Sequence, residues 1–232
     1  MKYRSLNRFI VEGLEGVSVA LAVLVSWPVS RRWLQNWGSF PKEVRRAWPG
    51  DAFVLPDHTT YTRAVTIHTS VSNVWPWLVQ FGLGRAGFYS YELLERLVGI
   101  PVKNVESIIP DCQDLAVGDK VLLHPKAPGI PVAALKRDSH ICFGVVSDPE
   151  RLVQKPDPAR SWSLYIEPRS ERASRLLLRS CVEPLRDRSF AKHLAALIEA
   201  PIDFVMEQRM LRTIKRLSES GAIQAGSPAV AS

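Results

Sequence analysis

The side chains with the clearest chemical potential lie in one short stretch, GLGRAGFYSYE at residues 82–92. A guanidinium or a phenol can orient a bound carbonyl group or exchange a proton with it. Arg85 and Tyr89 of this stretch, and Asn104 beyond it, are therefore candidate acid–base or orienting groups. Because tyrosine combines an apolar ring with a polar tip, the alternative is that Tyr89 and Tyr91 only pack a pair of helices.

The glycines of the same stretch, Gly82, Gly84 and Gly87, superficially match a dinucleotide-binding fingerprint. That fingerprint needs a strand before it and a βαβ unit around it, whereas a helical pattern precedes these glycines and strand patterns follow them. We interpret the glycines as a tight bend between two short helices. The side chains beside this bend are candidates for the mouth or wall of a cavity: Arg85, Phe88, Tyr89 and Tyr91.

Other titratable residues point less clearly to catalysis. Glu92, Glu95 and Arg96 share one helical face by their spacing, which predicts a solvated charge cluster. The five histidines are scattered and form none of the spacings of a metal site, so we expect neither a metal nor a cofactor. The three cysteines are widely spaced and are interpreted as small buried residues.

The net charge of +7 is concentrated near the N-terminus. Residues 1–50 hold eight Lys or Arg and three Glu, a balance of +5 that leaves +2 for residues 51–232. A nucleic-acid-binding face needs clustered basic residues, so this distribution argues against nucleic acid as a partner. Positive charge beside apolar residues is instead typical of a segment that contacts an anionic membrane surface.

The apolar run occupies residues 9–29, FIVEGLEGVSVALAVLVSWPV. It reaches the roughly 20 residues of a membrane span only if Glu12 and Glu15 are included. A carboxylate at the bilayer centre costs about 2.5–3.5 kcal/mol, but both glutamates lie near one end of the run. We predict membrane association through this segment, with a cytoplasmic domain. The alternatives are a helix packed on a soluble cytoplasmic domain and a signal peptide.

The rest of the chain shows strand and helix patterns in separate blocks. Residues 61–69 alternate and predict a strand with His68 facing outward. Helical spacing follows at 74–79 and 89–98. Five strand-like stretches come next: 120–124, 132–135, 140–146, 161–167 and 175–181.

The last strand and the C-terminal segment complete this pattern. Arg175 and Arg179 alternate with leucines in the strand, which predicts that one face of the strand is more exposed to water. An apolar helical stripe then runs over residues 194–217, with Pro201 inside it, where we expect a kink or a new start.

Segregated strands and helices predict an α+β protein. A strongly curved antiparallel sheet covered by one amphipathic helix leaves an internal pocket lined by aromatic and aliphatic side chains. The apolar candidates for its lining are Trp75, Phe143, Trp162, Leu164, Leu178, Val205 and Met206. The alternative is that these residues simply fill a core.

Five sequence segments, in this order of strands and helices, resemble the SRPBCC superfamily, which includes START lipid-transfer domains and polyketide cyclases. They are RAVTI (63–67), VWPWLVQFGLGRAGFYSYELLE (74–95), IIPDCQDLAVGD (108–119), SWSLYIEP (161–168) and FVMEQRMLRTIKR (204–216). The likeness is strongest to a bacterial branch with no assigned reaction and covers about residues 45–219. It implies the helix-grip (START-like) fold, in which a curved antiparallel sheet wraps a long C-terminal helix, with an extra N-terminal apolar helix.

The chain therefore divides into four predicted parts. These are a membrane-anchoring helix (1–37), a linker (38–58), the SRPBCC domain (59–219) and a disordered tail (220–232). We expect the domain to bind an apolar small molecule or lipid in its cavity, without catalysis. The alternative is a polyketide cyclase- or aromatase-like enzyme that uses the same cavity.

Overall fold

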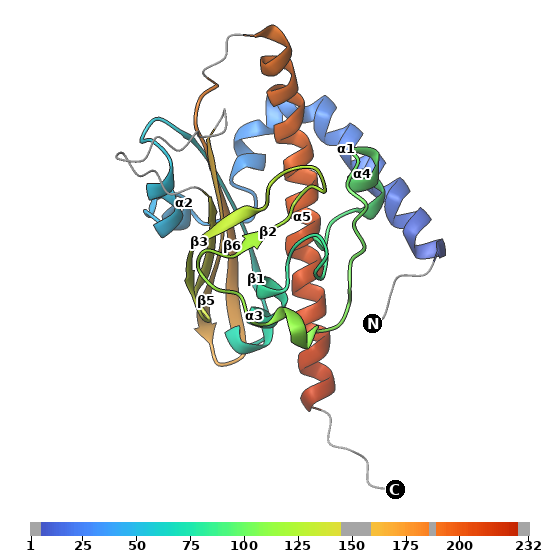
Figure 1. Cartoon of the computed structure of the whole chain (residues 1–232), viewed down its shortest axis with the longest axis vertical. Coiled ribbons are helices and arrows are strands. Elements are labelled where there is room, and N and C mark those ends of the chain that lie inside the picture. The colour runs from blue at the N-terminus through green and yellow to red at the C-terminus, as the bar shows by residue number, and fades with distance from the viewer. Residues whose placement is uncertain (1–5, 145–158, 186–188, 227–232) are drawn as a thin grey trace, which may run out of the picture.

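The computed structural model describes residues 6–144, 159–185 and 189–226. Its helices are α1 (Leu6–Gln35), α2 (Pro41–Arg45), α3 (Val71–Val79), α4 (Glu92–Leu97) and α5 (Phe190–Gly226), with short 3-10 helices η1 (Pro49–Phe53) and η2 (Pro110–Cys112) (Figure 1). Its strands are β1 (Thr59–Ile67), β2 (Lys120–Val121), β3 (Ile130–Lys136), β4 (His140–Gly144), β5 (Arg160–Ser170) and β6 (Ala173–Val182).

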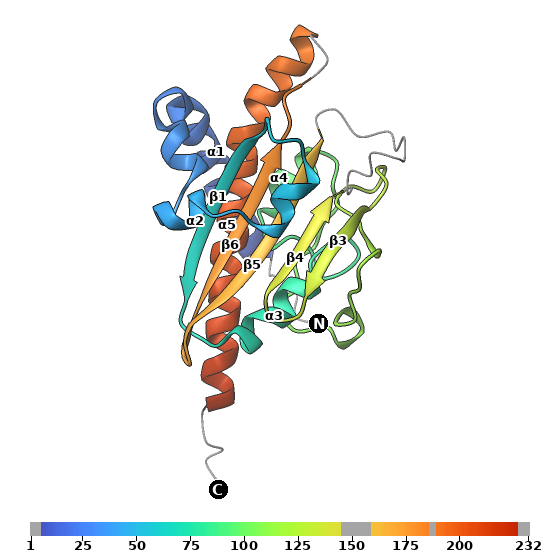
Figure 2. The same cartoon turned by 90° about the vertical axis from the view of Figure 1, so that its left-hand side faces the viewer.

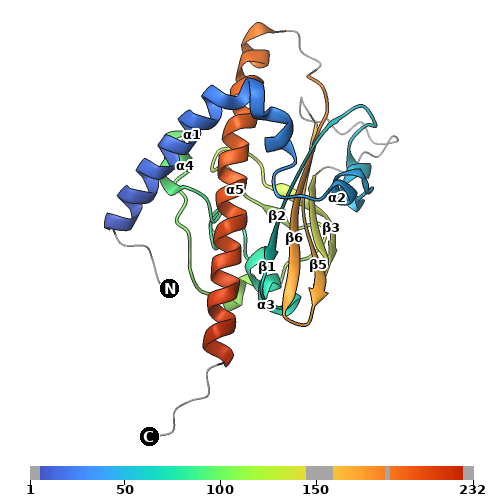
Figure 3. The same ribbon diagram turned by 180° about the vertical axis from the view of Figure 1, so that it is seen from behind.

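The six strands form one antiparallel sheet in the order β1-β6-β5-β4-β3-β2. Helix α5 crosses one face of this sheet, and α1 and α4 lie beyond α5 (Figures 1 and 3). Helix α2 lies over the opposite face, which Figure 2 shows. The predicted α+β class and the helix-grip arrangement, a curved sheet on a long C-terminal helix, are confirmed.

Period-two alternation in the strands explains where the core lies. Ile141 and Leu164 are opposite each other in the register of β4 and β5, and both are fully buried on the face that α5 covers. Helix α5 contributes Leu211 and Ile214 to the same core, three residues apart on one helical face. His68 is exposed, as predicted from its place in the alternating pattern.

Two predicted helices differ from the structure in their bounds. The helix predicted over 89–98 is reduced to α4, because Tyr89 has a φ of +57° and cannot continue a right-handed helix. Of the two alternatives expected at Pro201, the new start does not occur, since α5 runs through this residue and reaches Gly226. The end of the strand predicted over 140–146 lies partly outside the described residues.

The outer face of β6 is buried, although the sequence pattern predicted that it contacts water. Arg175 and Arg179 are 3% and 7% exposed, because α2 and η1 cover them. Glu43 of α2 accepts two hydrogen bonds from Arg175, at 2.9 and 2.8 Å. Asp51 of η1 accepts two from Arg179, at 2.6 and 2.9 Å. The segment predicted to be a linker is thus packed against the sheet through paired charges.

Helix α1 packs on α4 and α5 rather than standing apart from the domain. A Cβ atom at Gly13 would meet Leu93 at 2.5 Å, and one at Gly16 would meet the Tyr91 ring at 2.8 Å. The two glycines therefore permit a close approach of α1 to α4 that larger residues would prevent. The helix bends along its length (Figure 3), and Pro28 inside it removes one main-chain hydrogen bond.

Candidate functional site

An apolar pocket of about 220 Å³ lies between β5, α5 and the segment that contains α4. Its apolar lining consists of Phe81, Phe88, Ile100, Leu123, Trp162, Met206 and Met210. The aromatic side chains support one another: Phe81 stacks on Trp162 with ring centroids 5.1 Å apart and lies 5.3 Å from Phe88. Such contacts fix ring positions by shape and quadrupole, so this wall of the pocket is held in place before any ligand enters.

The polar lining of this pocket consists of Ser90, Glu95 and Glu207. Ser90 donates a hydrogen bond of 2.7 Å to Glu95, which is only 8% exposed. Burial raises the pKa of the Glu95 carboxyl and favours its neutral form. The predicted solvated cluster is therefore wrong for both glutamates of α4, because Glu92 is equally buried and accepts a hydrogen bond from the Asn104 N–H at 2.7 Å.

Glu207 connects two parts of the site. Its carboxylate accepts a hydrogen bond of 3.0 Å from the Trp162 indole and forms an ion pair with Arg63 of β1. The Arg63 side chain is only 1% exposed, and desolvation lowers its pKa to about 10, which leaves it charged at neutral pH. Glu207 also lines a second, polar pocket on the side away from the aromatic rings.

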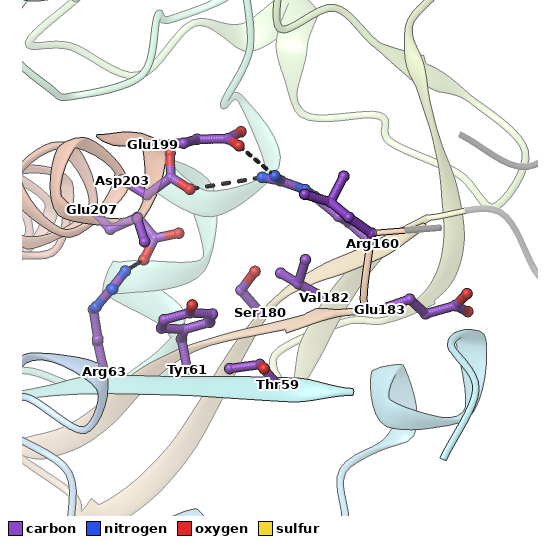
Figure 4. Close-up of a pocket in the computed structure, with 12 residues that line it drawn as sticks. Thr59, Tyr61, Arg63, Arg160, Ser180, Val182, Glu183, Glu199, Asp203 and Glu207 are labelled. Carbon is purple, nitrogen blue, oxygen red and sulfur yellow. Dashed lines mark hydrogen bonds and ion pairs between the residues drawn. The ribbon is translucent and has the colours of Figure 1, made fainter. Parts of the chain in front are cut away.

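The polar pocket has a volume of about 160 Å³ and lies between α5 and the adjoining ends of β1, β5 and β6 (Figure 4). Helix α5 contributes Glu199, Asp203 and Glu207, spaced four residues apart on one face. Arg160 of β5 lies 2.6 Å from Glu199 and 3.7 Å from Asp203, measured between nitrogen and oxygen. Tyr61 lies on the floor of the pocket beside them.

Asp203 is the carboxyl group in this pocket whose pKa is clearly raised. Burial, together with repulsion from Glu199, raises it to about 6, although Arg160 and Arg63 act in the opposite direction. The Asp203 side chain is still 46% exposed, so a ligand or water can reach it. No residue of this pocket was singled out from the sequence, although the four-residue spacing of the acids on α5 was visible.

The structure brings three of the predicted cavity residues together at the apolar pocket: Phe88, Trp162 and Met206. Others fill the neighbouring core: Trp75, Phe143, Leu164 and Leu178. Tyr91 and Val205 belong to a separate cluster where α1 meets α5. Sequence reasoning missed Met210, which follows Met206 by one helical turn on α5.

The predicted polar candidates instead hold the main chain around the pocket. Arg85 donates to the carbonyl oxygens of Val79 and Cys112 at 2.9 and 2.7 Å. Tyr89 is fully buried and donates to the Trp77 carbonyl oxygen at 3.1 Å.

Asn104 has the same supporting role in the pocket wall. Its side-chain oxygen accepts from the N–H groups of Phe88 and Tyr89 at 3.0 and 2.6 Å, and its amide nitrogen donates to the Ser90 carbonyl oxygen at 2.9 Å. Asn104 is 1% exposed, so these bonds are protected from water.

A curved antiparallel sheet that packs on a long C-terminal helix, with hollows between the two, defines the helix-grip fold. The fold that the sequence resemblance implies is therefore confirmed.

No family model and no curated protein matches the chain. It is similar to the solved structure of an aromatase/cyclase from a Streptomyces species, with 11% identity, a TM-score of 0.40 and coverage of 73% of this chain and 99% of that chain. It is also similar to a protein from Nitrosomonas europaea, with 13% identity, a TM-score of 0.42 and coverage of 73% of this chain and 99% of that chain. A polyketide-cyclase-like protein from Corynebacterium glutamicum has 12% identity and a TM-score of 0.33, with coverage of 77% of this chain and 100% of that chain.

Proposed function

We propose that this protein binds an apolar small molecule in the apolar pocket between β5, α5 and α4. The observation that carries the proposal is the pocket itself: a hollow of about 220 Å³ walled by aromatic and methionine side chains. Methionine adapts its shape to irregular partners, and a ring or chain that covers these side chains gains about 25 cal/mol per Å² of apolar surface buried.

The size and polar edge of the pocket define the class of ligand. A volume of about 220 Å³ is below the roughly 300–1,000 Å³ of sites for drug-sized ligands, so we expect a small ligand of up to about three rings or a short acyl chain. Glu95 at the edge is held toward its neutral form by burial, and a neutral carboxyl can donate a hydrogen bond to a ligand oxygen. The favoured ligand is thus apolar with one carbonyl or hydroxyl group.

Filling the pocket is expected to abolish binding. In Met206→Trp the larger side chain would occupy the hollow, and the affinity for the neutral fluorescent probe N-phenyl-1-naphthylamine should fall at least about tenfold. Ile198→Trp is the matched control, because Ile198 is 44% exposed on the same helix and does not line the pocket. Titration of probe fluorescence, with thermal melts to verify folding, measures the effect. Equal binding by Met206→Trp and wild type, or no binding by wild type, would contradict the proposal.

The second candidate is a polyketide cyclase- or aromatase-like enzyme, favoured by the raised pKa of Asp203. A carboxyl with a pKa of about 6 is suited to general acid–base catalysis near neutral pH, and Tyr61 and Arg160 beside it could orient a carbonyl group. We expect ¹³C NMR of the Asp203 side-chain carboxyl, assigned by its loss in Asp203→Asn, to titrate near pH 6. A midpoint near the ordinary value of 3.8 would remove the basis for this candidate.

A further inference from the structure

The outward face of α1 is largely apolar and is interrupted by the exposed Ser18. Its exposed side chains recur at spacings of four or seven residues, which places them on one side of the helix: Ile10, Leu14, Leu21, Val25, Val29 and Trp33. Val25 and Val29 are 82% and 94% exposed. The opposite side of α1 carries Val23 and Trp27, which are buried against the domain.

The two glutamates of α1 both have basic partners, and Glu12 is buried. Glu12 lies 2.9 Å from Arg8 and 3.0 Å from Arg209 of α5. Glu15 lies 3.7 Å from Arg209 and accepts a hydrogen bond of 3.2 Å from the Tyr91 hydroxyl, but its side chain remains 48% exposed. The buried Glu12 does not oppose contact between the outward face and hydrocarbon, and Glu15, near the N-terminal end of the helix, has its charge compensated by Arg209.

The packing of α1 determines how a bilayer could reach it. A membrane-spanning helix is surrounded by hydrocarbon or by other spanning segments over about 20 residues. Here Gly13 and Gly16 lock one side of α1 onto α4, and the charged Arg209 of α5 lies against it. A helix docked in this way exposes only its outward face, so a bilayer can contact it from one side alone.

The charges at both ends of α1 favour an anionic surface. Arg31 and Arg32 are exposed beside Trp33, which is 63% exposed. At the other end, the sequence places Lys2 and Arg4 just before the helix. Basic residues next to an interfacial tryptophan are typical of helices that lie at the level of anionic headgroups.

We propose that α1, while docked on the domain, lies in the plane of an anionic bilayer and inserts its outward apolar face between the headgroups. The helix does not cross the membrane. This contact holds the domain at the membrane surface, and it does not depend on which ligand occupies the apolar pocket.

Vesicle flotation of the full chain tests the proposal. Wild type should float with vesicles of phosphatidylcholine and phosphatidylglycerol, and less with pure phosphatidylcholine or at high salt. The double variant Val25→Glu/Val29→Glu should bind at least about tenfold more weakly, and it removes little packing because both side chains are exposed. Leu55→Glu/Val117→Glu, at exposed positions outside α1, introduces the same charge and should bind as wild type.

Alkaline carbonate extraction of host membranes separates the in-plane arrangement from a span. A docked, in-plane helix should release the protein at high pH, whereas a spanning helix should retain it. The proposal is overturned if wild type resists extraction, fails to float with anionic vesicles, or floats no better than the double glutamate variant. Circular dichroism of the variants confirms that reduced flotation does not come from unfolding.

Discussion

Asn104→Ala is expected to lower the free energy of unfolding by about 2–6 kcal/mol, because two buried main-chain donors lose their acceptor and each costs about 1–3 kcal/mol when unpaired. The two donors are the N–H groups of Phe88 and Tyr89, which the Asn104 side chain accepts at 3.0 and 2.6 Å. The Ser90 carbonyl oxygen loses its donor as well. Urea denaturation monitored by tryptophan fluorescence measures the loss.

The same substitution should also weaken the apolar pocket. Phe88 and Ser90 line it, and Asn104 holds the main chain of both. We therefore expect Asn104→Ala to reduce binding of N-phenyl-1-naphthylamine even without urea, where the variant is still folded. Asn36→Ala is the control, since the side-chain amide of Asn36 donates a long, exposed bond of 3.4 Å to the Arg32 carbonyl oxygen, and its effect should stay within about 0.5 kcal/mol. Equal stability of the two variants would show that the Asn104 hydrogen bonds do not stabilise the segment 88–90.

Arg175→Met is the second substitution with a large expected effect, a loss of about 3–5 kcal/mol in the free energy of unfolding. Arg175 and Glu43 expose only 4% and 3% of their side chains, so removal of the guanidinium leaves a carboxylate buried with reduced compensation. Arg137→Met serves as the control because the Arg137 side chain is 85% exposed, and its effect should be within about 0.5 kcal/mol.

Replacing both partners separates the ion pair from the packing. Glu43→Met/Arg175→Met should recover much of the lost stability, because an apolar pair of similar size avoids the desolvation cost of both charges. Equilibrium denaturation of both single variants and the double variant gives the coupling energy. A double variant as unstable as the sum of the single variants would show that the two residues act independently.

The same pair gives a direction for the pH dependence of stability. Burial alone would raise the pKa of Glu43, but hydrogen bonds from Arg175 and the Phe40 N–H outweigh it and hold the pKa below the ordinary value of 4.5. A carboxyl whose pKa is depressed by folding stabilises the folded state above its unfolded pKa. The contribution of Glu43 is therefore complete above pH 4.5 and is lost as the pH falls through its folded pKa.

Much of the apolar framework follows from local pattern. Alternation over residues 61–69 and the helical stripe after residue 194 predict β1 and α5, because period-two and period-3.6 patterns each bury one face of an element. Phe88, Trp162 and Met206 could be proposed for the pocket on the same grounds. Apolar side chains of this kind need only neighbours that shield them from water, and many arrangements of neighbours do so.

The polar residues could not be placed in this way, because their partners lie far away in the chain. Arg175 is paired with Glu43, which is 132 residues distant, and Asp203 acquires its raised pKa mainly by burial in a pocket whose other walls come from β1, β5 and β6. A charge on a strand is expected to be solvated unless another segment covers it, and here the segment over 38–53 covers Arg175. Burial and pairing of charges depend on long-range contacts, which local periodicity does not contain.

Helix α1 shows the division most clearly. Its apolar composition, two glutamates and flanking basic residues were determined by the sequence alone. Its docking was decided by the tertiary structure, because the closeness to α4 depends on Gly13 and Gly16 meeting Leu93 and Tyr91. The same segment that composition marks as a possible span is therefore packed along one side on α4 and α5, while its other side is exposed, because the two glycines allow a close approach that composition alone does not specify.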